Sequence, residues 1–166
     1  GIEINADNFE YDLNKNLINA KENVVVRNIL KNYTISADVI SYLLDEKKIY
    51  TKGETFADFR SKYNFQSSNV TLLTDKKELF SNKKTTITDK SNLYKLEKFR
   101  YFIEKEELKG EKILINTNYK LPTSDKTYFS NAIINLKKQS FFGSDVKIKI
   151  RKDIFENTNN DPRILG

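Results

Sequence analysis

A short sequence pattern returns along this chain at a fixed interval. The segment Asn5–Tyr11 (NADNFEY) returns as Ser36–Tyr42 (SADVISY) and, in weaker form, as Ser67–Leu72 (SSNVTL). Asp7 to Asp38 is 38 − 7 = 31 positions, and Asp38 to Asn69 is 69 − 38 = 31. Two fainter copies follow at 96–101 and 129–133. A fixed period of this length indicates one supersecondary unit that stacks on copies of itself.

Each copy has the pattern of β-strands. Apolar and polar residues alternate over 2–6, 33–37 and 40–44, which is the period of a half-buried strand. The apolar spacing changes to three between Ala6 and Phe9, and again between Ala37 and Ile40. A change of parity at the same place in two copies predicts a bulge or a corner.

Polar clusters separate the predicted strands. Segments 12–16, 45–48, 75–77 and 104–107 have the composition of hairpin loops. A second turn is expected in each unit, because Gly and Asn tolerate a positive φ. The residues at these second turns are Asn23, Gly53, Asn82, Gly110 and Gly143.

No segment shows a helical period over three turns. We therefore predict an all-β, antiparallel β-jelly roll, built from about five hairpin repeats over residues 1–150, with residues 151–166 as a linker. A parallel β-helix is the alternative closure, but its coils are usually shorter and more regular.

Composition excludes several kinds of site. The 166 residues include no Cys and no His, which rules out disulfides, cysteine nucleophiles, most zinc sites and most Ser/His triads. The net charge of +6 comes from lysines that often stand beside acids, as a solvated surface would have. No apolar run reaches the ~20 residues of a membrane-spanning helix. Asp7 and Asp38 are interpreted as turn or bulge hydrogen-bonding residues rather than metal ligands.

The repeat itself resembles a known family. Ala-Asp-x-x-x-Tyr, a polar turn, then apolar-x-Ala-x-Gly/Asn-x-Val is similar to the OstA-like domain of lipopolysaccharide transport proteins, and it occurs here over 5–26 and 36–57. The closing stretch 152–163 resembles the junction between the N-terminal periplasmic domain of LptD-type assembly proteins and their outer-membrane barrel. The third and fourth copies depart from the pattern, since they lack the Ala-Asp pair.

This resemblance implies a function. It implies an OstA/LptA-like jelly roll at the periplasmic face of the outer membrane, which binds lipopolysaccharide acyl chains between its sheets and passes them toward a barrel that follows residue 166. It implies two partners, an LptA-like periplasmic bridge protein that adds to an edge strand and an LptE-like lipoprotein held through the barrel. It implies neither an enzyme nor a cofactor. A free-standing LptA-like bridge subunit and a non-transport β-sandwich interaction module are the alternatives.

The residues expected to carry this function belong to two groups. The expected interior slot consists of Val24, Val26, Ile35, Ala37, Ile40, Tyr42 and Ala57. The expected docking edge consists of Ile2, Ile4 and Ala6. From the residues alone, the same apolar set is typical of a closed core. Four lysine pairs could meet phosphates at the rim of a slot, namely 47–48, 76–77, 83–84 and 137–138. Phe141 and Phe142 are interpreted as a strand end that packs on the core rather than as a membrane-touching tip.

Two other functions remain open from the residues alone. The positive charge and the many Phe and Tyr residues would suit a binder of single-stranded nucleic acid, although these side chains do not gather in one stretch. A carbohydrate-active enzyme would need two carboxylates across a cleft, and no pair is singled out.

Overall fold

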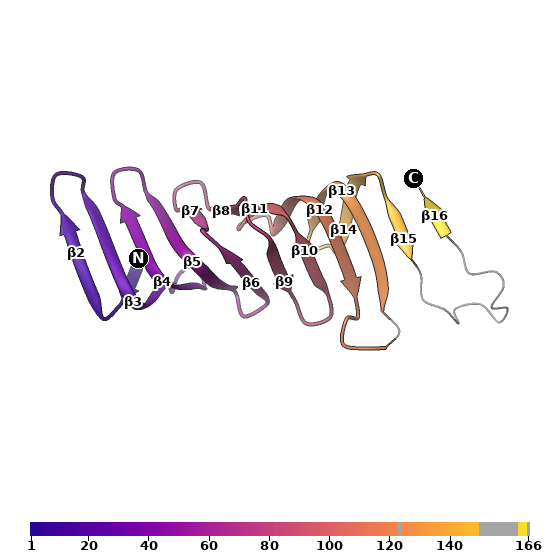
Figure 1. Cartoon of the computed structure of the whole chain (residues 1–166), viewed down its shortest axis with the longest axis horizontal. Helices are drawn as coiled ribbons and strands as arrows, with labels where there is room; N and C mark the ends of the chain where they lie inside the picture. The colour runs from indigo at the N-terminus through magenta and orange to yellow at the C-terminus, as the bar shows by residue number, and fades with distance from the viewer. Residues whose placement is uncertain (123, 150–162, 166) are drawn as a thin grey trace.

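The computed structural model describes residues 1–122, 124–149 and 163–165, and in that part of the chain every regular element is a β-strand. The strands follow one another along an elongated molecule, with the first and last strands at opposite ends (Figure 1). Their bounds are β1 Ile2–Asn5, β2 Asn8–Asp12, β3 Leu17–Asn28, β4 Tyr33–Leu43, β5 Lys48–Phe59, β6 Tyr63–Ser68, β7 Thr71–Leu73, β8 Glu78–Ser81, β9 Thr85–Thr88, β10 Leu93–Leu96, β11 Lys98–Phe102, β12 Glu107–Thr117, β13 Asp125–Asn135, β14 Ser140–Ser144, β15 Lys147–Lys149 and β16 Arg163–Leu165.

All pairings are antiparallel and they form two facing sheets that share five long strands. Sheet I runs in the order β2, β3, β4, β5, β7, β8, β11, β12, β13, β14, and sheet II in the order β1, β3, β4, β5, β6, β9, β10, β12, β13, β15, β16. The five shared strands bend midway, so that one half of each belongs to each sheet. The strands β5, β6, β9, β10, β12, β11, β8 and β7 close a ring of pairings in the middle of the molecule. The predicted all-β jelly-roll architecture is confirmed.

The long strands bend along a line that we call the corner, and the sequence repeat marks this line. The Asp7 amide donates to the Glu22 carbonyl at 3.1 Å, and the Asn69 amide donates to the Gly53 carbonyl at 3.0 Å. The register of β4 shifts between Ala37 and Val39, on either side of Asp38. Each copy of the repeat therefore places its acidic or amide residue where the chain passes from one sheet to the other, which confirms the predicted corner.

Of the expected second turns, Asn82 lies between β8 and β9 as predicted, and the other four residues lie inside strands. Asn23 and Gly53 have positive φ values of 52° and 81°, but they lie inside β3 and β5 and bend one continuous strand rather than joining two. In β12 the positive φ, 48°, belongs to Lys112 and not to Gly110. Period-two alternation cannot distinguish a bent strand from two short ones, because side chains return to the inner face after the bulge.

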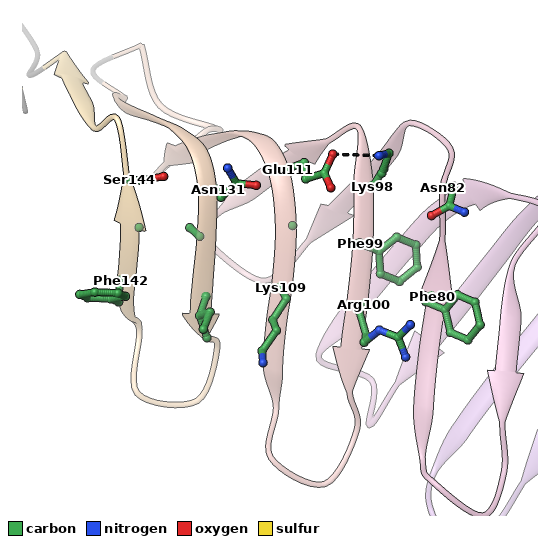
Figure 2. Close-up of a pocket in the computed structure, with 14 residues that line it drawn as sticks. Phe80, Asn82, Lys98, Phe99, Arg100, Lys109, Glu111, Asn131, Phe142 and Ser144 are labelled. Carbon is green, nitrogen blue, oxygen red and sulfur yellow. Dashed lines mark ion pairs between the residues drawn. The ribbon is translucent and has the colours of Figure 1, made fainter.

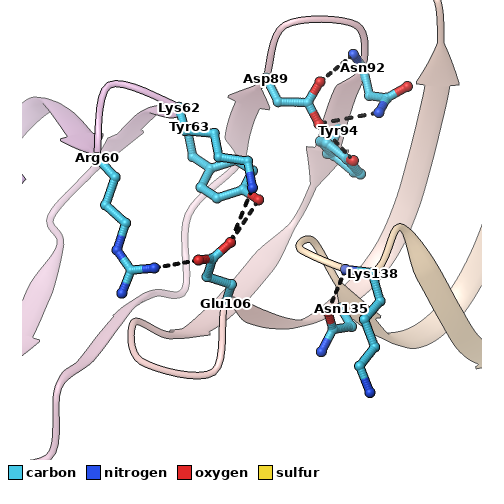
Figure 3. Close-up of polar contacts among 9 residues, drawn as sticks. All are labelled: Arg60, Lys62, Tyr63, Asp89, Asn92, Tyr94, Glu106, Asn135 and Lys138. Carbon is cyan, nitrogen blue, oxygen red and sulfur yellow. Dashed lines mark hydrogen bonds and ion pairs between the residues drawn. The ribbon is translucent and has the colours of Figure 1, made fainter.

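The turns that end the two sheets lie opposite the corner, and we call them the rim. The predicted hairpin loops join β2 to β3, β4 to β5, β7 to β8 and β11 to β12 at the rim of sheet I. At the rim of sheet II, Asp89 accepts the Ser91 and Asn92 amides at 2.8 and 2.7 Å and the Tyr94 hydroxyl at 3.1 Å (Figure 3). Burial raises the pKa of Tyr94, and the neighbouring Asp89 carboxylate raises it further.

Candidate functional site

The space between the sheets is lined by two long rows of cross-strand neighbours. Because directly paired residues in antiparallel strands share a face, the pairings define each row without a break. In sheet I the row is Tyr11, Ile18, Tyr42, Ile49, Leu72, Leu79, Tyr101, Leu108, Ile134 and Phe141. In sheet II it is Ile4, Val26, Ile35, Ala57, Phe65, Ile87, Tyr94, Ile115, Thr127 and Ile148. The interior is thus one apolar strip that runs the length of the molecule.

All seven residues expected in the interior slot face this strip. Val24, Val26, Ile35, Ile40 and Ala57 are buried, while Ala37 and Tyr42 are half-buried and pack against the same cluster. The structure therefore brings them together between the sheets. Whether they bind lipid stays a prediction.

The middle of the interior is filled by aromatic rings that sequence reasoning did not single out. Phe59 and Phe65 of sheet II lie 5.2 and 5.0 Å, between ring centroids, from Tyr101 of sheet I, and Phe65 lies 5.6 Å from Phe99. Alternation in β6 and β11 would have assigned these positions to the inner face. The weak third and fourth copies of the repeat left the parity of this region undetermined.

Towards the N-terminal end the interior becomes accessible. Phe9 pairs with Ala20 and Tyr11 pairs with Ile18, so both aromatic side chains face inward, yet each is 53% exposed. They are exposed because β2 is the last strand of sheet I and nothing in the described chain covers it. The apolar strip is therefore open to solvent at this end.

The predicted docking edge lies at the same end. Ile2 and Ile4 belong to β1, which pairs only with β3 among the described strands. These two residues and Ala6 pack partly buried against the interior. One side of β1 thus has backbone groups without a strand partner in the described chain, as strand addition requires.

At the rim, a buried carboxylate joins the two sheets. Glu106, in the turn between β11 and β12, accepts hydrogen bonds from Arg60, from Lys62 at 3.3 Å and from Tyr63 at 3.0 Å (Figure 3). Burial opposes ionisation of Glu106, but the Tyr63 hydroxyl and the two cations outweigh it, so that the pKa of Glu106 is below its usual value. We call this group the Glu106 cluster.

Next to the Glu106 cluster a hollow of ≈ 410 Å³ opens between the rims of the two sheets. The buried side chains of Tyr33, Leu72 and Ile103, which belong to the core, are among those that line it. Three cations, Lys31, Arg60 and Lys77, also line it, together with Glu104. This rim hollow therefore combines apolar interior residues with a positively charged border.

Glu104 holds two of these cations in place. Its carboxylate lies 2.6 Å from the Lys77 ammonium and 3.3 Å from that of Lys31. Lys77 and then Lys31 lower the pKa of Glu104. One carboxylate between two ammonium groups, with Arg60 nearby, leaves the hollow with excess positive charge. Of the lysine pairs noted in the sequence, 76–77 is the one that contributes to this border.

The two acidic residues of the repeat differ: the bulge hydrogen bond expected of both is found for Asp7, and the Asp38 side chain forms none with the described residues. Asp7 accepts a hydrogen bond from the Asn23 amide group at 2.7 Å, which agrees with the bulge interpretation, and Asp38 is exposed. Within residues 1–122, 124–149 and 163–165, no three His, Cys, Asp or Glu side chains are grouped as a metal site would need. In the same ranges, no helix has the length and apolar character to cross a membrane.

The strand end at 141–142 is divided between the two faces. Phe141 pairs with Ile134, faces inward and lies 5.0 Å from the ring of the buried Phe129. It is still 48% exposed, so it packs on the core with part of its surface only. Phe142 faces outward and is 81% exposed, so the interpretation is wrong for this residue. Adjacent strand residues point to opposite faces, so only one of the two can reach the core.

Comparison with known proteins returns a distant structural likeness. No family model and no curated protein matches the chain. Solved structures that match include LptH from Pseudomonas aeruginosa, described as the LptA homologous periplasmic component of the conserved lipopolysaccharide transport device. The match covers 100% of this chain and 94% of that chain, with 10% sequence identity and a TM-score of 0.36. The architecture described above therefore rests on the strand pairing of this chain and not on this likeness.

Proposed function

We propose that this chain is a non-enzymatic carrier of an anionic, acyl-chain amphiphile, and that its cargo is lipopolysaccharide. The observation that carries the proposal is the apolar strip between the sheets, which is open at the N-terminal end and borders a cationic hollow at the rim. Acyl chains need an apolar groove with few unpaired polar atoms, and anionic headgroups need cations at its border.

The buried polar groups of the interior agree with this proposal. Near the corner, the Thr51 and Thr55 hydroxyls bond to one another at 2.6 Å, as do those of Ser67 and Thr85 at 2.7 Å. Since these hydroxyls have partners, they do not need water between the sheets. An acyl chain that lies beside these hydroxyls would leave none of them without a hydrogen-bond partner.

The rim supplies the headgroup chemistry. Lys31, Lys77 and Arg60 border the hollow, with core side chains among its other lining residues, so a phosphate could contact the cations while its acyl chain enters between the sheets. The proposal requires the rim to separate, because the aromatic rings and the Glu106 cluster keep the sheets together in this structure.

The finer form of the proposal places the chain at the end of a periplasmic bridge. Strand β1, with Ile2, Ile4 and the adjoining Ala6, would pair with an LptA-like bridge protein, and a barrel following the chain would hold an LptE-like lipoprotein at the outer membrane. What supports it is the free side of β1 and the resemblance of 152–163, most of which lies outside the described residues. A free-standing LptA-like subunit of the bridge agrees equally well with the strand arrangement.

Site-specific photo-crosslinking in cells that export lipopolysaccharide tests the cargo. A photoreactive residue at Tyr11 or Tyr42, which face the interior, is expected to form lipopolysaccharide adducts. Glu10 is the matched control, because it lies beside Tyr11 in β2 and faces outward. If the two inward positions form no adduct, or Glu10 forms as much, the chain is a β-sandwich interaction module and not a carrier.

A further inference from the structure

The outer face of sheet I carries a second hollow. It shares no lining residue with the rim hollow. It measures ≈ 560 Å³ and extends over β8, β11, β12, β13 and β14 (Figure 2). Pockets of this size are typical of small-molecule sites. Five strands at about 4.8 Å spacing make it about 19 Å long, enough for a short polymer that crosses the strands.

Three small residues of the inner face also line this hollow. Gly110, Ala132 and Gly143 are consecutive cross-strand neighbours on the inner face. A Cβ added to Gly143 would stand 2.6 Å from Phe129 Cδ1 of the neighbouring strand β13, so no side chain fits at this position.

The middle of the hollow holds two cations side by side. Arg100 and Lys109 are direct cross-strand partners on the outer face, and like charges in this position repel one another. The Arg100 guanidinium is fixed, since it stacks over the Phe80 ring at 4.6 Å and lies 2.6 Å from Glu78. Lys109 forms no ion pair with any carboxylate of the described residues and lies 5.2 Å from the Phe102 ring. An anion bound beside Lys109 would give this ammonium the charge partner that Arg100 already has in Glu78.

The surroundings of the two cations are those of a saccharide site. Phe142, 81% exposed, offers a bare ring face at one end of the hollow (Figure 2). Beside the cations runs a row of polar side chains, Glu111, Asn131 and Ser144, which are cross-strand neighbours. Glu111 forms an ion pair with Lys98 at 3.0 Å (Figure 2), so Asn131 and Ser144 are the members of this row that form no ion pair. Aromatic faces pack against the apolar faces of sugar rings, and carboxylate, amide and hydroxyl groups bind sugar hydroxyls.

Other ligand classes fit less well. Phe80 is covered by Arg100, so nucleic-acid bases would find one free ring in this hollow rather than a series. An acyl chain would need a continuous apolar path, which the central cations interrupt. We propose that this hollow binds an oligosaccharide that bears carboxylate or phosphate groups, independently of the interior cargo.

Titration of the full chain with tetragalacturonate, followed by ¹⁵N NMR and calorimetry, tests the site. Saturable binding is expected, with shifts confined to β8 and β11–β14. The methyl ester of the same tetramer, which has lost the charges, is expected to bind at least roughly tenfold more weakly, as the loss of charge-assisted hydrogen bonds predicts. Inorganic phosphate alone should produce no saturable shifts.

Two exposed substitutions should weaken binding without affecting the fold. Lys109→Gln is expected to weaken it roughly tenfold and Phe142→Ala several-fold. Lys95→Gln and Phe56→Ala are the matched controls, because both residues are exposed on the outer face of sheet II.

Equal binding of the methyl ester, or equal loss in the controls, would overturn the proposal in favour of a nonspecific surface. Saturation by phosphate alone would reduce the hollow to an adventitious ion site, and slowed tumbling without ligand would identify it as a protein interface. None of these substitutions changes a residue of the interior. A failure of the saccharide proposal would therefore not count against the carrier proposal, which the photo-crosslinking experiment tests.

Discussion

The Tyr63 hydroxyl donates a 3.0 Å hydrogen bond to Glu106 and so connects the rim of sheet II to the rim of sheet I. Tyr63 is fully buried, and its ring lies 6.4 Å from that of Tyr101 in the aromatic middle of the interior. The same carboxylate that closes the rim therefore also fixes one ring of the core. Glu106 therefore contributes both to stability and to closure of the rim.

Replacing this carboxylate should destabilise the fold. Glu106→Gln removes the charge that Arg60 and Lys62 face, and we expect a loss of about 1–2 kcal/mol in the free energy of unfolding. Urea unfolding at pH 7 measures it. Glu46→Gln is the control, since Glu46 forms an exposed ion pair with Lys48 at 3.7 Å and should change stability little. Equal losses in the two variants would contradict a special role for Glu106.

The stabilising effect of Glu106 should disappear in acid. Its folded pKa lies below its usual value, so the carboxylate stabilises the fold above the unfolded pKa of about 4.3, and this contribution is lost as pH falls through the folded pKa. The stabilities of the wild type and Glu106→Gln should therefore approach one another below the unfolded pKa and converge once the pH lies below the folded pKa of Glu106. A difference in stability that persists there would mean that the variant acts through packing and not through charge.

The repeat was sufficient to predict the architecture, the corners and the inward face of the first two copies. Asp7, Asp38 and Asn69 occupy equivalent corners because the same bend recurs in each unit. The aromatic middle and the Glu106 cluster could not be predicted in this way. Arg60 and Glu106 are 46 residues apart and meet only through the twist and facing of the two sheets, which a local pattern does not encode.

The two glycines of the outer hollow were predicted as turn residues, and their structural role is different. A Cβ on Gly110 would overlap Leu96, while one on Gly143 would stand 2.7 Å from the Asn131 carbonyl oxygen. The flexible end of the Leu96 side chain can move away from a new Cβ at Gly110, whereas the Asn131 backbone cannot move away from one at Gly143. We expect Gly143→Ala to cost about 2–3 kcal/mol and Gly110→Ala about 1 kcal/mol, measured by thermal or urea unfolding.

Gly53→Ala provides the comparison for these two variants. Nothing lies within 4 Å of a Cβ at Gly53, but its φ is +81°. Gly53→Ala should therefore lower the free energy of unfolding by about 1 kcal/mol through backbone strain alone. Gly53→Asn should lose less stability than Gly53→Ala, because Asn tolerates a positive φ. No such rescue is expected at Gly143, and a rescue there would contradict the packing explanation.

Asn69 and Asp38, which occupy equivalent corners, should differ in how much they contribute to the free energy of unfolding. Asn69 accepts the Gly53 amide proton at 2.9 Å through its side chain, and it has a φ of 50° that Asn adopts more readily than Ala. Asn69→Ala is therefore expected to cost about 1–2 kcal/mol. Asp38→Ala should cost less than about 0.5 kcal/mol, because the exposed Asp38 side chain has no partner among the hydrogen bonds of the described residues. Chemical unfolding of the two variants and the wild type measures this difference. Equal losses of stability would mean that the Asn69 hydrogen bond does not stabilise its corner.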